Sequence, residues 1–180
     1  MIDTLVVRPG TYTPAATTTI TNESVIVETS AIIQLGNDID LVVTSPARVY
    51  LRPDVRISVT EAEAPTGTGT NASRAEVIVS GGLFEAKGSI DSPVVFTSTV
   101  SGWNGIELES ATLIFDRVNI ERAFHAIELK PSTLAESFVL RNSRIDSGSD
   151  YPIRVTNINL FGDTRSDVSG LLLNANTPDR

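Results

Sequence analysis

Apolar and polar residues alternate along most of the chain, in short runs that turn residues interrupt. The alternation is clearest from Pro93 to Leu129, and a period of two residues is typical of strands that bury one face. Each run is about three to five residues long, which leaves no room for a helix. The pattern therefore predicts a succession of short β-strands. Its apolar positions are Val94 and Phe96, Ile106 and Leu108, Leu113 and Phe115, Val118 and Ile120, and Ile127 and Leu129.

The alternation also repeats at intervals of roughly 25 residues, within the range expected for repeat proteins. Leu113 and Phe115, for example, return as Phe138 and Leu140. A fixed period of this length indicates a solenoid, in which each coil buries its inner face only by stacking on neighbouring coils. We therefore expect an all-β fold with negligible helix. The positions expected in its core include Ile120, Ile127, Phe138, Leu140, Ile145 and Ile153.

The length of the chain fits a single domain over residues 1–180. Residues 61–75 lack the apolar alternation and are rich in Thr, Ala and Gly, so they are expected to form a surface loop inserted between coils. That loop is either a tolerated insertion or a segment that contacts a substrate or partner. Residues 174–180 are expected to form a polar tail.

Composition narrows the class of protein. The chain has 22 acidic and 14 basic residues, a formal net charge of -8, and no basic stripe that could neutralise phosphates, so we expect no nucleic-acid partner. It has no cysteine, which excludes disulfides and thiolate metal sites. No apolar run reaches the roughly 18 residues that a membrane span needs. No secretory leader is legible after Met1, so the chain is either cytoplasmic or a mature or trimmed form.

Three segments carry a family resemblance: GGLFEAKGSIDSPVVFTS at 81–98, GWNGIEL at 102–108 and VNIERAFHAIEL at 118–129. Together they resemble the right-handed parallel β-helix of the pectate-lyase-like superfamily, and most of all the repeats of bacterial surface and secreted β-helix proteins. The resemblance implies three short strands per coil, stacked about 4.8 Å apart in parallel sheets, and about seven coils. It also implies an extracellular or cell-surface location.

Charged residues alternate with apolar ones in three strands that lie one repeat apart, beginning at Ile106, Ile127 and Ile153. If the apolar residues point inward, the residues between them point outward. Stacking then places three outward residues in one column and three more in a second column beside it. The first column is Glu107, Glu128 and Arg154, and the second is Glu109, Lys130 and Thr156.

Two interpretations of these columns remain open. The resemblance implies a site, because enzymes of that superfamily hold acidic and basic site residues on such a sheet, and paired acids could bind Ca²⁺ or transfer protons. Alternatively the columns are solvated surface, with Glu128 paired to Arg154 and Glu109 to Lys130, each pair contributing only ~0.2–1 kcal/mol. In that arrangement Glu107 has no partner within its own column unless the preceding coil supplies one.

Trp103 and His125 are the other candidates for chemistry. Trp103 lies at a corner between glycines, where its ring would either stack on a sugar or pack against the coil. His125 is the only histidine and falls in a turn before a strand, with no Ser or Cys partner in the pattern. There is no phosphate-binding loop and no HExxH motif. We therefore expect no catalytic residues, no cofactor and no metal, although enzyme activity stays open.

Two functional classes follow. The first is a non-catalytic extracellular β-helix module with a structural, adhesive or self-assembling role. A solenoid exposes unpaired strand edges at its first and last coils, and no capping helix is legible before Leu5 or after Leu173, so we expect homo-oligomers, filaments or larger assemblies formed through the coil ends. The alternative is a module that binds or cleaves polysaccharide.

Overall fold

The computed structural model describes residues 4–21, 24–36, 39–60, 74–99, 103–130, 138–147, 153–155, 167–169 and 172–175. All regular structure in these residues is β-strand, and the described part of the chain contains no helix. The strands form three parallel sheets, here called sheets A, B and C. The expected all-β solenoid is therefore confirmed.

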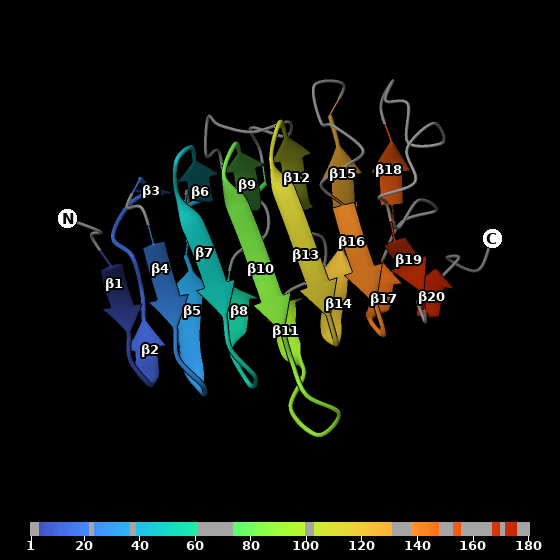
Figure 1. Ribbon diagram of the computed structural model, residues 1–180, viewed down its shortest axis with the longest axis horizontal. Helices are drawn as coiled ribbons and strands as arrows, with labels where there is room; N and C mark the ends of the chain where they lie inside the picture. Colours follow the sequence, from blue (N-terminus) through green and yellow to red (C-terminus); the bar gives the residue numbers. More distant parts are fainter. Residues whose placement is uncertain are drawn as a thin grey trace.

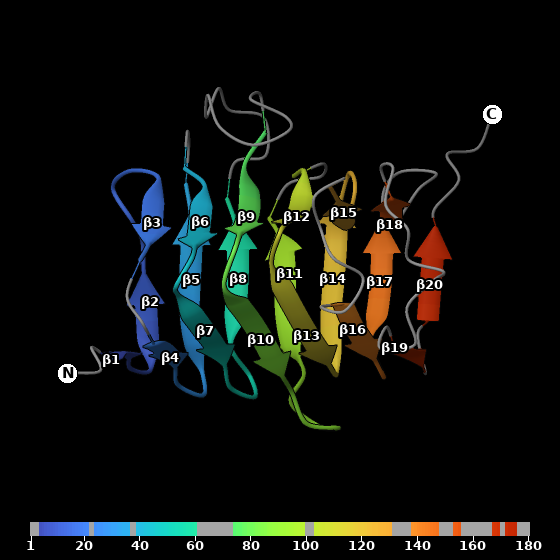
Figure 2. The ribbon, with the colours of Figure 1, turned by 45° about the horizontal axis from the view of Figure 1, so that its top comes forward.

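Successive strands of the chain enter sheets A, B and C in turn (Figures 1 and 2). Sheet A contains β1 (Thr4–Val7), β4 (Ser24–Val27), β7 (Arg48–Leu51), β10 (Leu83–Lys87), β13 (Thr112–Asp116), β16 (Phe138–Arg141) and β19 (Asp167–Ser169). Sheet B contains β2 (Gly10–Tyr12), β5 (Ala31–Leu35), β8 (Arg56–Val59), β11 (Val94–Ser98), β14 (Val118–Ala123), β17 (Arg144–Ser147) and β20 (Leu172–Ala175). Sheet C contains β3 (Thr18–Ile20), β6 (Leu41–Thr44), β9 (Glu76–Ser80), β12 (Gly105–Glu109), β15 (Ile127–Leu129) and β18 (Ile153–Val155).

Each strand pairs in parallel with the corresponding strand of the next coil, for example β10 with β13 and β11 with β14. In Figure 1 the chain advances from left to right, while the strands of sheet A run downward in front and those of sheet C run upward behind them. The coil is therefore right-handed, as is usual for parallel strands joined by crossovers. Sheets A and B each hold seven described strands, in agreement with the expected seven coils.

The core is a set of inward columns, one residue per coil. One column of sheet A passes through buried residues of five successive coils: Val27, Leu51, Ala86, Phe115 and Leu140. At the middle of the rod three phenylalanines pack together, with ring centroids 6.1 Å apart for Phe84 and Phe96 and 5.4 Å apart for Phe96 and Phe115. Removing such side chains from water, at about 25 cal/mol per Å² of apolar surface, is the main favourable contribution to folding.

The expected core positions are buried with one exception. Ile120, Ile127, Leu140 and Ile145 are at most 1% exposed, and Phe138 is 3% exposed. Ile153 is only partly buried. It belongs to β18, which is the end strand of sheet C in the described part of the chain, so β15 packs against it from one side only.

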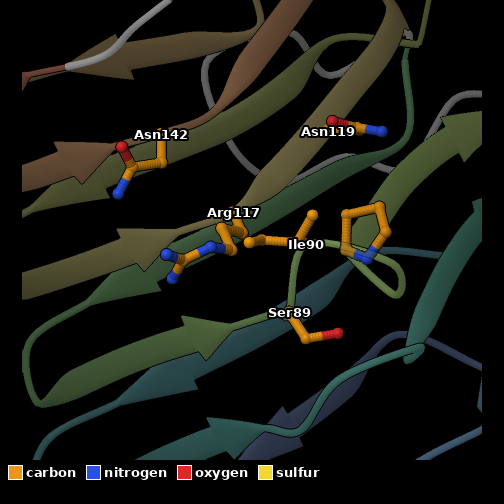
Figure 3. A pocket seen from close by; sticks show the side chains of 6 residues that line it. Ser89, Ile90, Arg117, Asn119 and Asn142 are labelled. Carbon is orange, nitrogen blue, oxygen red and sulfur yellow. The ribbon is translucent and has the colours of Figure 1, made fainter.

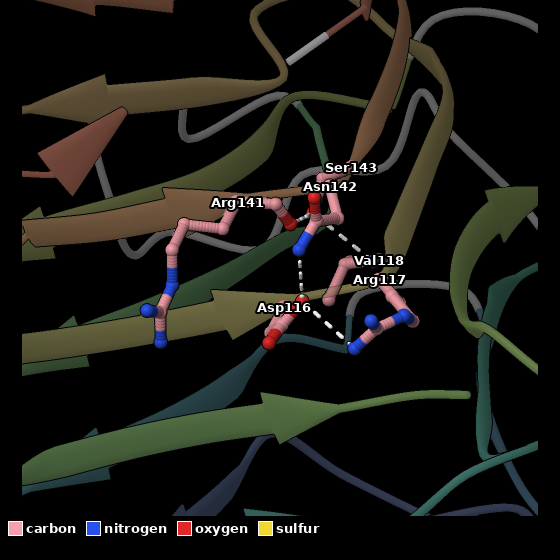
Figure 4. Close-up of polar contacts among 6 residues, drawn as sticks. All are labelled: Asp116, Arg117, Val118, Arg141, Asn142 and Ser143. Carbon is pink, nitrogen blue, oxygen red and sulfur yellow. Dashed lines mark hydrogen bonds and ion pairs between the residues drawn. The ribbon is translucent and has the colours of Figure 1, made fainter. Parts of the chain in front are cut away.

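The corner between sheets A and B repeats one backbone conformation. Four coils place a residue with positive φ there, between 50° and 66°, and these residues are Ser30, Asp54, Arg117 and Asn142. Short polar residues tolerate this conformation better than most side chains do. Their side chains also bond between coils: Ser30 Oγ donates to Asp54 Oδ2 at 2.7 Å, and Asn142 Nδ2 donates to Asp116 Oδ1 at 2.9 Å (Figure 4). The corners therefore stack in register, as the strands do.

Gly105 begins β12 at a point where another coil comes very close. Its φ is +120°, and a Cβ at this position would overlap the carbonyl oxygen of His125 in the next coil. Ile106 N donates to Ala126 O at 3.0 Å in the same place. Only glycine fits, so the Trp-Asn-Gly corner reflects the spacing between coils.

Two boundaries differ from the sequence-based expectation. Residues 61–73 of the expected inserted loop lie outside the described part, but Ala75, at its end, is fully buried directly before β9. Residues 174 and 175 of the expected tail belong to β20, because Asn174 and Ala175 pair with Asp146 and Ser147 of β17. Because β20 pairs in parallel with β17, it continues beyond the apolar run that ends at Leu173 in the sequence.

Replacing Phe138 should test the coil register. Phe138→Ala removes a side chain that is 3% exposed and should lower the free energy of unfolding by about 3–5 kcal/mol, because a cavity remains. Val139→Ala is the matched control, since the next residue of β16 points to the other face and is partly exposed. It should cost less than ~1 kcal/mol. Urea unfolding followed by circular dichroism measures both, and equal losses would contradict the register.

Candidate functional site

The charged column expected on sheet C exists in the backbone register. Glu107 aligns with Glu128, and Glu128 aligns with Arg154, across β12, β15 and β18. Toward the N-terminus the column continues through Ile78 and Val42. Charge in this column is thus confined to the later coils, and β6 and β9 present the aliphatic residues Val42 and Ile78 at the same place.

Glu107 and Glu128 are buried, with 6% and 3% of their surface exposed. The expectation that this column faces water as a solvated ladder is therefore wrong for both acids. A carboxylate withdrawn from water is costly unless a cation or hydrogen-bond donors replace the lost hydration. The structure supplies such a cation from the neighbouring position.

Lys130 lies between the two acids. Its Nζ is 3.8 Å from Glu107 Oε2 and 3.7 Å from Glu128 Oε1, and its side chain is 22% exposed. The ion pairs of Lys130 therefore run to Glu107 and Glu128, whereas the sequence predicted a pair with Glu109. Glu107 consequently has a cation, although it does not come from its own column. The long lysine stem makes this possible because it can reach two coils at once.

The remaining members of these columns are less well defined. Thr156 lies outside the described residues, and Arg154 is placed by its backbone register alone. The arrangement in hand is therefore two buried carboxylates that share one partly buried ammonium. It can stabilise the stacking of β15 on β12, and it presents little acid surface to a ligand in solution.

Trp103 is part of the core. It is fully buried, its indole Nε1 donates to the carbonyl oxygen of Glu121 at 2.9 Å, and its backbone bridges to Ala123 of the next coil. An aromatic ring must present a face to stack on a sugar, and this ring presents none. Of the two roles expected for Trp103, packing against the coil is therefore the one observed.

Sequence reasoning missed a buried polar ladder where the chain enters sheet C. Asp40, Glu76 and Asn104 stand one coil apart and are 0%, 0% and 3% exposed. Asp40 Oδ1 accepts a hydrogen bond from Glu76 N at 2.8 Å, and Glu76 Oε1 accepts one from Asn104 Nδ2. The detectable signal is that each residue immediately precedes or begins a strand of sheet C. Hydrogen bonds within the ladder compensate for its burial, so we interpret it as structural.

His125 continues this ladder into the next coil. Its backbone N donates to Asn104 O at 2.9 Å, and it lies in a bend before β15, as expected. Its ring is 4.4 Å from the ring of Phe124, over which the Arg74 guanidinium sits at 4.7 Å. These contacts hold the bend against the rod.

A surface hollow of about 450 Å³ lies beside the corner between sheets A and B (Figure 3). Arg117, Asn119 and Asn142 supply polar groups, while Ile90 and Pro93 supply apolar surface from the connection between β10 and β11. Arg117 Nη1 is already 3.3 Å from Asp116 Oδ1. The hollow offers amide and guanidinium donors to a ligand, but part of the arginine charge is compensated.

The N-terminal end of the rod is apolar and open. A hollow of about 150 Å³ enters the core there, lined by Leu5, Val7, Tyr12, Pro14, Thr18 and Ile20 of the first coil and by aliphatic residues of the next two coils. Leu5 is 48% exposed and Tyr12 is 42% exposed. Leu5 aligns with the buried Val25, so it occupies a core position that no coil of the described chain covers.

No family model matches the sequence, and neither a curated protein nor a solved structure matches it. No helix in the described ranges is long and apolar enough to cross a membrane. Among the residues that the structure places, no three His, Cys, Asp or Glu side chains are grouped to hold a metal ion. The fold therefore defines the class of protein, a parallel β-solenoid, and its first described coil is apolar and exposed.

Removing the cation from the acid pair should destabilise the rod. Lys130→Met leaves Glu107 and Glu128 buried without it and should cost roughly 1–3 kcal/mol in urea unfolding. Adding Glu128→Gln should restore part of the loss, because the repulsion between the acids disappears. Lys87→Met is the control: its Nζ lies 2.7 Å from Glu85 Oε2, but the lysine is half exposed, so the loss should stay below ~1 kcal/mol. Equal losses at the two lysines would contradict the buried cluster.

Proposed function

We propose that the protein is a non-catalytic extracellular β-helix module, of the pectate-lyase-like kind that its repeats resemble, with a structural, adhesive or self-assembling role. Its activity is to bind another polypeptide through its N-terminal coil. The observation that carries this proposal is the exposed core at that end, where Leu5 and Tyr12 line an apolar hollow.

Two properties make this end suited to a polypeptide. The strands β1, β2 and β3 are the end strands of their sheets, so their outer backbone edges can accept further strands. Beside these edges lie apolar side chains, which gain free energy when a partner removes them from water. A partner that supplies both strand edges and apolar residues satisfies both requirements. A small polar ligand satisfies neither.

The charged column favours a non-catalytic role. Catalytic acids must reach a substrate, whereas Glu107 and Glu128 are buried and share Lys130. Glu107, Glu128, Lys130, Glu109 and Arg154 remain our candidates for any ligand contact on this part of the rod, whereas the buried Trp103 is no longer one of them. Binding there would require the column to open.

The alternative, a module that binds or cleaves polysaccharide, has one observation in its favour. The hollow beside Arg117, Asn119 and Asn142 combines donors with an apolar wall, which suits the carboxylate and ring of an acidic sugar. Because Asp116 already contacts Arg117, we expect weak binding at most.

Association in solution tests the proposed function. The protein should form concentration-dependent oligomers in sedimentation velocity, and Leu5→Glu should weaken their association at least roughly tenfold, because it places a charge in the apolar contact. Leu5 is 48% exposed, so the variant should still fold. Ile90→Glu is the control, since Ile90 is 84% exposed on the side of the rod and should leave association unchanged. Oligomers that persist in Leu5→Glu would overturn the role of this end.

Calorimetry separates the two functional classes. We expect no heat when millimolar Ca²⁺ or acidic oligosaccharide is titrated into the protein, because the paired acids are buried and already share a cation. Micromolar Ca²⁺ binding that disappears in Glu107→Gln would favour a lyase-like site on sheet C. Oligosaccharide binding that disappears in Arg117→Gln would instead place polysaccharide in the hollow.

A further inference from the structure

We infer that the partner of the open N-terminal coil is the last coil of a second copy of this chain, which docks in the register that a further coil would have. The inference rests on the proposed function and names its partner. It follows from the order of strands in the three sheets and from the residues that share each column.

The two ends of the rod have matching polarity. In sheet A, β1 stands at one end and β19 at the other, and in sheet B the end strands are β2 and β20. All neighbouring strands are parallel, so β19 and β20 can pair with β1 and β2 of a second copy without reversing direction. The contact is head to tail and repeats from copy to copy.

The columns predict which residues meet at this junction. In sheet A one column of backbone register partners runs from Val7 through the buried Val27 and Leu140 to Val168. In sheet B a second runs from Tyr12 through Ile33, Ile57, Phe96, Ile120 and Ile145 to Leu173. Continuing each column by one coil aligns Val168 with Val7 of the second copy, and Leu173 with its Tyr12.

These alignments are apolar on both sides. Val7 and Tyr12 line the N-terminal hollow, whose volume of about 150 Å³ is large enough to admit an aliphatic side chain. The docked coil would therefore complete the core in the way each coil completes the one before it. An unrelated partner would need two parallel strands with the same spacing and the same corner. The chain's own last coil supplies two such strands, β19 in sheet A and β20 in sheet B.

Sheet C behaves differently at the junction. The last coil has described strands in sheets A and B, whereas the last described strand of sheet C, β18, belongs to the coil before it. A second copy docked on β19 and β20 would place its β3 two strand spacings from β18, about 9.6 Å away. Close contact is thus expected in sheets A and B and not between β18 and β3.

Salt should strengthen this contact. Each copy carries a formal charge of -8, so two copies repel one another at low ionic strength. Salt screens that repulsion while leaving strand pairing and apolar burial in place. An association driven by opposite charges would weaken under the same conditions.

Disulfide trapping tests the register, because the chain has no cysteine of its own. Two single-cysteine variants are purified separately, mixed and oxidised by air. The pair for sheet A is Val6→Cys with Asp167→Cys, and the pair for sheet B is Thr11→Cys with Leu172→Cys. Asp167 and Leu172 end the columns that begin at Val6 and Thr11. Adjacent parallel strands hold Cα atoms about 4.8 Å apart, within the range of a disulfide.

Two mismatched mixtures are the controls. Thr19→Cys with Arg154→Cys probes sheet C, where the expected Cα separation of about 9.6 Å exceeds the reach of a disulfide. Val6→Cys with Ile90→Cys measures chance collision, because Ile90 is 84% exposed on the side of the rod. Each single variant is first shown to keep its β-sheet circular dichroism and its association.

We expect the sheet A and sheet B mixtures to yield roughly tenfold more disulfide-linked dimer than either control, because docking raises the local thiol concentration. Yields should rise with sodium chloride. Matched and control mixtures that cross-link equally, in protein whose association still depends on Leu5, would overturn the register and the last coil as the docking element while leaving the proposed function standing. Cross-linking of Thr19→Cys with Arg154→Cys alone would show a junction displaced by one coil. If the unmodified protein shows no association in sedimentation velocity at any concentration, both proposals are overturned.

Discussion

The stacking of one coil on the next is the interaction on which this structure depends. No coil has a core of its own, since an inward residue such as Phe115 is covered only by residues of neighbouring coils, among them Ala86 and Leu140. The same stacking joins the backbones in parallel sheets. Corners must then share one conformation, which the positive φ values at Ser30, Asp54, Arg117 and Asn142 achieve.

Stacking also brings like residues together and creates a problem wherever they are charged. Glu107 and Glu128 occupy adjacent positions of one column and are both buried, so their carboxylates repel each other. Lys130, which belongs to the neighbouring column, offsets this repulsion because its ammonium lies near both acids. Asp40 and Glu76 meet the same constraint at the entry to sheet C, where Asn104 and backbone N–H groups supply hydrogen bonds. Contacts between neighbouring coils thus compensate for the burial of these four acids.

In the described residues the first coil is stacked on one side only. Val7 and Tyr12 align with core residues of the second coil alone, and the hollow beside them is lined mostly by aliphatic side chains. We therefore propose that this coil carries the function. In the proposed assembly, the register between coils would set the geometry of the contact.

The sequence by itself determined the strands, their direction and their columns, because a period of two residues and a repeat of constant spacing are local properties of the chain. The alignment of Glu107, Glu128 and Arg154 followed from that spacing and is present in the register. Only the tertiary structure decided which outward positions are covered, which cation reaches which acid, and that Trp103 lies in the core while Ile153 is partly exposed. The burial and the ion pairs of a side chain depend on which residues of neighbouring coils lie over it. Apolar and polar alternation along one strand does not specify those residues.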